Sequence, residues 1–213
     1  MTKPPYWDDA ARELASRDPV LRKLIAATPE LHLTRRGDPF TTLARAIVGQ
    51  QISVKAAQAI WDRLVAACGS ASAVPPVLDA ARVTRKRIAT LRGLGLSERK
   101  AEYIRDLARH FVSARLEPSR WTTLDDEALI EALVDVKGIG RWTAEMFLMF
   151  HEMRADSLPL DDLGLQKAMA LHYFGGERRP LTELRAFAEK WRPYRSVATW
   201  YLWRSMDPVP VEY

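Results

Sequence analysis

The stretch "VDVKGIGRWTAEMFLMF", residues 134–150, places two glycines around one isoleucine and continues directly into an apolar pattern typical of a helix. The segment before it, "DDEALIEALVDV" at 125–136, also carries apolar residues at three- and four-residue spacing. The two patterns together predict a pair of helices joined by the short turn "VKGIG". The pattern does not by itself say why the turn contains two glycines.

One interpretation of the turn is a nucleotide cradle, which needs the pattern G-x-G-x-x-G between a strand and a helix. Here Thr143 or Ala144 stands where the third glycine would be, and no strand precedes the turn, so this interpretation fails. Two others stay open. The glycines can simply cap and start helices, or they can present backbone N–H groups to a phosphate at a helix N-terminus, with Arg141 adding positive charge.

The rest of the chain also reads as helix, and no run alternates and ends as a strand would, so the sequence predicts an all-α fold. The expected helices are 18–28, 53–68, 97–114, 125–136, 141–153, 161–174, 181–191 and 195–206. The residue types that favour helix N-caps stand at Ser53, Ser97, Asp125 and Ser196.

Composition excludes several classes of protein. The chain has 213 residues, of which 47% are hydrophobic and 28% charged, and its formal charge of +5 permits a polyanionic partner without requiring one. Its single cysteine, Cys68, excludes an intrachain disulfide, a Cys-ligated zinc site and an iron–sulfur cluster. No signal-peptide core and no 18-residue apolar run is found, so we expect a cytoplasmic protein without membrane partners.

Several blocks, taken together, resemble one family. "KGIGRWTAEMFLMF" is followed by "LPLDDLGLQKA", and three more blocks match in order: "LARAIVGQQISVKAA" (43–57), "GLSERKAEYI" (95–104) and "WRPYRSVATWYLWR" (191–204). The chain resembles the helix–hairpin–helix (HhH-GPD) DNA glycosylase superfamily, in particular its bacterial 3-methyladenine DNA glycosylase II branch. The resemblance extends roughly over residues 18–206.

This resemblance implies a particular architecture. We expect two helical lobes with a DNA groove and a base pocket between them. Residues 38–154 would form the lobe that carries the hairpin, and residues 1–37 with 155–213 would form the other. The additional N-terminal α/β domain of some relatives is not expected, and the protein would act as a monomer associated with the nucleoid.

The resemblance also gives chemical roles to residues whose local pattern is ambiguous. Two aspartates that open a helix after a proline usually act as caps. The family alignment gives the cap to Asp161 and makes Asp162 the catalytic carboxylate, which would stabilise an oxocarbenium-like sugar, activate water, or do both. Bifunctional relatives carry a Schiff-base lysine where this chain has Trp142, so we expect base release without strand cleavage.

The implied base pocket is lined by Trp142, Met146, Leu163 and Trp203. An indole face attracts a cation, which suits a 3-methyl or 7-methyl purine. Met146 and Leu163 stand where some relatives have tyrosines, so the lesion could instead be hypoxanthine, uracil or another base. A non-catalytic lesion-sensing protein is the alternative from a different functional class.

The remaining site residues also follow from the resemblance. Gln51 would be the wedge that fills the gap left by a flipped nucleotide. The residues expected to bind double-stranded DNA are Gln50, Gln51, Ser53, Lys137, Gly138, Gly140, Arg141 and Thr143. Backbone carbonyls of Val134, Val136 and Ile139 would hold a structural Na⁺ or K⁺, and no other cofactor is expected. The four histidines show no paired metal spacing and are interpreted as packing or surface residues.

Overall fold

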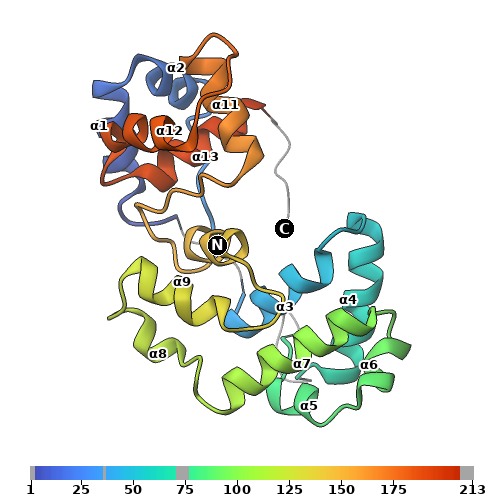
Figure 1. Cartoon of the computed structure of the whole chain (residues 1–213). Coiled ribbons are helices and arrows are strands. Elements are labelled where there is room, and N and C mark those ends of the chain that lie inside the picture. Colours follow the sequence, from blue (N-terminus) through green and yellow to red (C-terminus); the bar gives the residue numbers. More distant parts are fainter. Residues whose placement is uncertain (1–2, 36, 71–76, 207–213) are drawn as a thin grey trace. The chain divides into compact units, whose positions relative to one another are not determined.

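The computed structural model describes residues 3–35, 37–70 and 77–206, and helices dominate it (Figure 1). Over these ranges there is no strand, and Gly69 and Leu78 form an isolated β-bridge. The all-α prediction is therefore confirmed. The predicted lobes also include residues 1–2, 36, 71–76 and 207–213, which lie outside the described residues.

The chain divides into two compact units. Of the described residues, 3–35 and 148–206 form one, here called the terminal unit, and 37–70 with 77–147 form the other, the central unit. The terminal unit contains α1 (Trp7–Arg17), α2 (Pro19–Ala27), α11 (Leu163–Tyr173), α12 (Leu181–Ala188), the 3₁₀ helix η1 (Glu189–Trp191) and α13 (Arg195–Met206). The central unit contains α3 (Pro39–Gly49), α4 (Val54–Cys68), α5 (Ala80–Thr84), α6 (Ile88–Gly93), α7 (Glu98–Val112), α8 (Pro118–Trp121) and α9 (Asp126–Val134). The division lies within α10 (Arg141–Phe150).

Three of the four predicted N-caps are confirmed. The side chains of Ser53, Ser97 and Asp125 each accept a hydrogen bond from the backbone N–H three residues further on. The fourth prediction is wrong, because α13 begins at Arg195 and Ser196 lies inside it, fully buried. The Ser196 hydroxyl instead bonds both backbone groups of Ser157, which only tertiary packing brings within reach.

Several predicted helices are too long at their C-terminal ends, and in two of them a left-handed residue lies within the predicted range. The patterns over 97–114 and 141–153 continue past the observed ends at Val112 and Phe150. Ala114 and Met153 have φ values of 56° and 57°, a left-handed conformation that a helix cannot continue through. Side-chain periodicity does not report where the backbone reverses, so the pattern alone overestimates the length.

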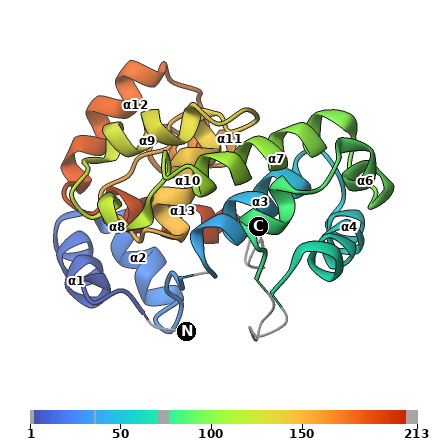
Figure 2. The ribbon, with the colours of Figure 1, turned by 90° about the horizontal axis from the view of Figure 1, so that it is seen from below.

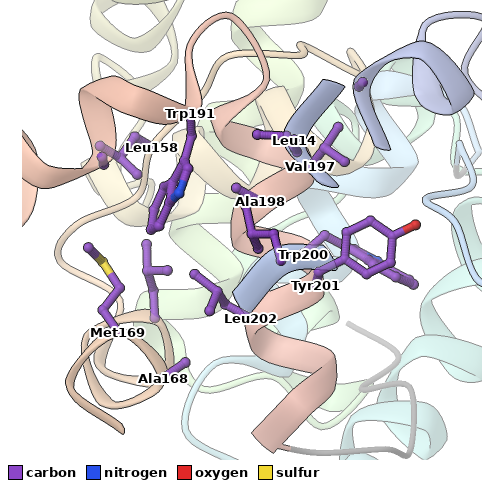
Figure 3. Close-up of a cluster of buried hydrophobic side chains, with 14 of the residues drawn as sticks. Leu14, Leu158, Ala168, Met169, Trp191, Val197, Ala198, Trp200, Tyr201 and Leu202 are labelled. Atoms are coloured by element: carbon purple, nitrogen blue, oxygen red, sulfur yellow. The ribbon is translucent and has the colours of Figure 1, made fainter. Parts of the chain in front are cut away.

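The core of the terminal unit is built around α13. Seven consecutive residues of this helix, from Ser196 to Leu202, are buried, so α13 is surrounded by packing on all its sides. Figure 3 shows Trp200, Tyr201 and Leu202 of α13 in one cluster with Leu14 and Trp191. Most of the C-terminal aromatic residues therefore belong to the core, as their clustering in the sequence indicates.

The core of the central unit is organised by α7. This helix packs against α3, α5 and α6, and Figure 2 shows it running beside α3. Ile104 and Leu107 of α7 and Ile47 of α3 are fully buried. Among the described residues, no helix has the length and apolar character needed to cross a membrane.

Candidate active site and DNA-binding hairpin

Asp162 begins the helix α11 in the terminal unit. Its Oδ1 accepts the backbone N–H of Leu165 at 2.7 Å, so Asp162 is the N-cap of α11. The prediction that Asp161 takes the cap is wrong: Asp161 lies one residue further out, in an exposed turn. The capping bond fixes the Asp162 carboxylate at the positive end of the helix dipole, which stabilises a carboxylate there.

The loop that delivers Asp162 is itself held firmly. Leu158 and Leu160 point into the core, with exposed fractions of 8% and 3%. The Gln166 side chain donates a hydrogen bond to the Leu160 carbonyl at 2.7 Å. The carboxylate is therefore supported by packing from the loop before it and by the first turn of the helix after it.

Trp203 of α13 makes the second contact to the carboxylate. Its indole N–H donates to the same Oδ1 of Asp162 at 2.8 Å. The ring lies nearly parallel to Phe150, with centroids 6.0 Å apart and an interplanar angle of 10°. The sequence predicts Trp203 as an aromatic wall but not this hydrogen bond. The two residues are separated by 41 positions, so no local pattern could have indicated it.

Gly164 permits this close approach. A Cβ at this position would lie 2.9 Å from Oδ1 of Asp162 and 3.5 Å from Nε1 of Trp203. Contacts under 3.0 Å are almost never made by real Cβ atoms, so a side chain would displace the carboxylate. Gly164 was not among the predicted site residues, although "DDLGL" displays it within the matching block.

The other predicted pocket residues lie on two helices. Leu163, beside Asp162, is 64% exposed in the terminal unit. Trp142 and Met146 occupy successive turns of α10 in the central unit, with Trp142 36% exposed and Met146 half-buried. Trp142 and Leu163 therefore each present apolar surface to solvent within their own unit.

The hairpin turn joins α9 to α10 within the central unit. Gly138 has φ +85°, and a Cβ there would overlap the ring of Tyr103, so only glycine fits. By contrast, nothing lies within 4 Å of the position that a Cβ would take at Gly140, next to the first residue of α10. One glycine is thus required by the backbone and by packing, whereas the other leaves open space at a helix N-terminus.

The predicted DNA-binding residues near the turn are partly engaged within the protein. Arg141 bonds both carboxylate oxygens of Glu127 at 2.6 and 2.7 Å and Glu145 at 3.1 Å. The hydrogen bonds that Arg141 donates to Glu127 raise the pKa of Arg141, despite some desolvation, and Glu145 adds to this. Thr143 is buried, with 9% of its surface exposed. The backbone N–H of Lys137 donates a hydrogen bond to Asp106 Oδ2 at 3.0 Å.

The loop between α3 and α4 contains the predicted wedge. Gln51 is exposed and has φ +56°, a left-handed conformation that is rare outside glycine. Gln50 turns inward, and its side-chain amide donates to the Gly138 carbonyl at 2.9 Å. Ser53 caps α4 through its hydroxyl, at 3.3 Å from the Ala56 N. The structure thus connects this loop directly to the hairpin turn.

Of the three predicted cation-binding carbonyls, that of Val134 belongs to the last residue of α9, and those of Val136 and Ile139 belong to the hairpin turn. Val136 accepts the N–H of Ile139 at 3.1 Å, which holds the turn in a tight conformation. Carbonyl oxygens are suitable ligands for a hard cation, and a carbonyl with one hydrogen bond keeps a second lone pair. The Val136 carbonyl therefore keeps a lone pair of the kind that such an ion binds. Elsewhere in the described part of the chain, no three His, Cys, Asp or Glu side chains are grouped to hold a metal.

The chain is similar to known proteins over most of its length. Residues 44–193 match the family described as "HhH-GPD superfamily base excision DNA repair protein". DNA-3-methyladenine glycosylase 1 of Schizosaccharomyces pombe is 32% identical over 174 residues, covering 79% of this chain and 72% of that protein. YfjP of Bacillus subtilis, also named for DNA-3-methyladenine glycosylase, is 31% identical over 79% of this chain, which spans only 59% of that relative.

Two solved structures agree with these matches. DNA-3-methyladenine glycosidase from Bacillus halodurans has a TM-score of 0.85 and 34% identity, covering 97% of this chain and 93% of that one. The S. pombe 3-methyladenine DNA glycosylase Mag1, solved in complex with abasic DNA, has a TM-score of 0.77 and 28% identity, covering 96% and 98%. The chain belongs to the HhH-GPD superfamily of base excision DNA repair proteins.

Proposed function

We propose that this protein is a monofunctional DNA glycosylase that removes alkylated purines from double-stranded DNA and leaves an abasic site. The relatives named above are 3-methyladenine glycosylases, and one of them was solved with abasic DNA. The observation that carries the proposal is the Asp162 carboxylate, held by the Leu165 N–H and the Trp203 indole N–H in the matched family fold.

The reaction requires a carboxylate of this kind. Breaking an N-glycosidic bond builds positive charge on the deoxyribose, and a fixed carboxylate stabilises that charge without reorganising. Asp162 can also orient or deprotonate the attacking water, which would transfer its hydroxyl group to C1′ as the base departs with the bonding electrons. A 3-methyl or 7-methyl purine is already cationic and departs as a neutral base, so no strong general acid is required.

Recognition of the base is assigned to the predicted pocket residues. A glycosylase must first extrude its target from the stack, and Gln51 is the proposed wedge in the resulting gap. A cationic base over an indole face gains roughly 0.5–2 kcal/mol, a role that suits Trp142 or Trp203. Trp142 lacks the amine that a lyase needs for a Schiff base, so the product strand stays intact until it is treated with alkali.

The hairpin is proposed to grip the DNA backbone. Gly140 leaves space at the N-terminus of α10, where N–H groups and the helix dipole favour a phosphate. A monovalent cation on the carbonyls of Val134, Val136 and Ile139 would add positive charge beside it. Replacing K⁺ with a bulky tetraalkylammonium ion at constant ionic strength should then weaken DNA binding, and equal affinity would contradict the cation site. The monomeric state and the nucleoid location belong to the same proposal.

The test is a base-release assay on duplexes that each contain one modified base. The panel holds 7-methylguanine, 3-methyladenine, hypoxanthine and uracil, and each product is analysed with and without alkali. We expect free base from the methylated purines, with strand breaks only after alkali. Breaks without alkali would contradict the monofunctional assignment.

The other outcomes separate the alternatives. Release of hypoxanthine or uracil alone would keep the enzyme and change its substrate. Tight binding to an abasic analogue, with no release from any member of the panel, would indicate a lesion-sensing protein and sink the proposal.

A further inference from the structure

The block "GLSERKAEYI" (95–104) matches the family, yet the proposed reaction gives it no role. It forms the start of α7, and four residues of this helix contact the wedge loop or the hairpin turn. They are Lys100, Tyr103, Asp106 and His110, which lie on one face because of their spacing of three, three and four. One helix face thus touches both segments proposed to bind DNA.

Lys100 holds the end of α3. Its ammonium donates to the Val48 carbonyl at 2.8 Å and to the Gln50 carbonyl at 2.6 Å. The last carbonyls of a helix lack partners within it, and a cation there is favoured by both hydrogen bonding and the dipole. Burial lowers the pKa of Lys100, which agrees with an ammonium removed from solvent to make these bonds. Gln50, one of its two partners, directly precedes the wedge residue.

The other residues of this face hold the hairpin. The Tyr103 ring lies against Gly138, Asp106 accepts the Lys137 backbone N–H at 3.0 Å, and His110 Nε2 lies 3.1 Å from Asp135 Oδ2. These contacts follow the turn from residue 135 to residue 138. The end of α9 and the first half of the turn are therefore fixed to α7.

A hydrogen bond also joins the wedge loop directly to the hairpin turn. The Gln50 side chain donates to the Gly138 carbonyl at 2.9 Å, so Gln50 is bound by Lys100 through its backbone and bound to the hairpin through its amide. Gln51 comes next, in a left-handed conformation that is unfavourable for a residue with a side chain and persists only where its surroundings enforce it. The contacts of Gln50 are in the right place to enforce it.

We propose that α7 is a positioning element for base flipping, in which Lys100 and Gln50 fix the Gln51 wedge relative to the hairpin that holds the phosphate backbone. The inference rests on the proposed function, and it adds residues that touch neither the base nor the sugar. If the wedge is held at a fixed distance from the phosphate grip, binding of the backbone delivers it to one nucleotide. A loosened wedge would bind DNA equally well but flip the base less efficiently.

The test removes the ammonium with Lys100→Met, which keeps the length and apolar stem of the side chain. Arg99→Met is the matched control, because it removes one positive charge from an exposed neighbouring position of α7. Lys100→Arg should restore part of the function, since it keeps a charged donor. Gln50→Met breaks the same chain of contacts at a second point and carries the test if Lys100→Met does not fold.

The first readout is the single-turnover excision rate of 7-methylguanine in two duplexes, one paired with cytosine and one placed opposite a mismatched base. Loss of a charge-assisted hydrogen bond should slow excision from the paired duplex roughly tenfold. Flipping a mismatched base requires less unpairing energy, so excision from the mismatched duplex should slow much less than excision from the paired one. The affinity of Lys100→Met for undamaged DNA should stay unchanged. A merely structural defect would instead slow both substrates equally, and that result, or wild-type rates, would overturn the inference.

The second readout does not depend on catalysis. 2-Aminopurine at the target position brightens when it leaves the stack, so its fluorescence on binding reports flipping directly. Lys100→Met and Gln50→Met should both reduce this signal, whereas Arg99→Met should not. If the wild type releases no base, the proposed function fails but this assay still decides the inference, because undiminished brightening in both variants would refute it.

Discussion

Two aspartates of the terminal unit occupy nearly the same local arrangement and differ in what surrounds them. Asp18 caps α2 through Oδ1, and Asp162 caps α11 through Oδ1. Each also accepts an indole N–H, from Trp191 at 3.1 Å and from Trp203 at 2.8 Å. Each is thus an N-cap aspartate with a tryptophan donor supplied by a distant part of the chain.

The two aspartates differ in how far the protein encloses their carboxylates. Asp18 is 1% exposed. Its Oδ2 also accepts a hydrogen bond from the Tyr173 hydroxyl and forms an ion pair with Lys190, whose Nζ lies 3.0 Å away. Asp162 is partly exposed, beside the 64% exposed Leu163. A carboxylate enclosed by donors stabilises the fold, whereas one that is oriented but accessible can face a substrate. The same local motif therefore supports either role, and accessibility decides between them.

The largest expected effect is on catalysis at Asp162. Asp162→Asn keeps a side-chain oxygen for the cap but removes the negative charge, so excision should fall by roughly 10²–10³-fold or more. Asp125→Asn, which alters the exposed N-cap of α9, is the control. Single-turnover base release and thermal melting of both variants measure the effect. Comparable activity in the two variants would remove Asp162 from the mechanism.

Asp18→Asn should show the opposite pattern, with stability lost and activity per folded molecule retained. Burial raises the pKa of Asp18. The hydrogen bonds from Trp191 and Leu21 and the Lys190 ammonium lower this pKa by more than burial raises it, so the net shift is downward. Removing one partner of a buried ion pair should lower the free energy of unfolding by about 2–3 kcal/mol near neutral pH, as urea titration would measure.

The pH dependence of that difference follows from the direction of the shift. A carboxylate whose folded pKa is depressed stabilises the fold above its ordinary value of about 3.9 and loses that contribution as pH falls through the folded pKa. The stability difference between wild type and Asp18→Asn should therefore shrink on acidification. A difference that grows toward acid pH would contradict a lowered pKa.

Trp203→Phe tests the donor at the accessible site. Phenylalanine can still stack on Phe150 but cannot donate to Asp162, so we expect excision to slow roughly tenfold. Stability should change little, because the cap from Leu165 remains. Trp191→Phe is the matched change, because it removes the indole donor to Asp18. It should lower the melting temperature but leave the excision rate per folded molecule unchanged. If Trp203→Phe excises normally, its indole N–H has no part in orienting the carboxylate.

The smallest effect is expected from Gly164→Ala. The new methyl group would lie 2.9 Å from Asp162 Oδ1, so the carboxylate must shift by a few tenths of an ångström. We expect a several-fold loss of excision with little change in DNA affinity, because Gly164 is placed against the carboxylate and Trp203. Parallel measurements of rate and affinity would check this, and a loss of affinity alone would assign Gly164 to DNA binding instead.

The sequence by itself determined the helical class and most helix starts. The caps Ser53, Ser97 and Asp125 act over three residues, and apolar periodicity acts over one or two turns, so both signals are local and readable. The same locality explains the error at Ser196, which has the residue type of a cap but lies inside α13. The cap expected at Asp161 follows from the resemblance to the family, and Asp162 makes it instead.

Only the tertiary structure decided what holds the site residues. The Trp203 bond to Asp162 joins positions 41 apart, and the Lys100 bonds to Val48 at the end of α3 and to Gln50 join positions 52 and 50 apart. Asp18 and Asp162 each follow or adjoin a proline and open a helix, so the chain alone does not distinguish the buried cap from the accessible one. Burial and long-range hydrogen bonds are properties of packing, which arise only when distant helices meet.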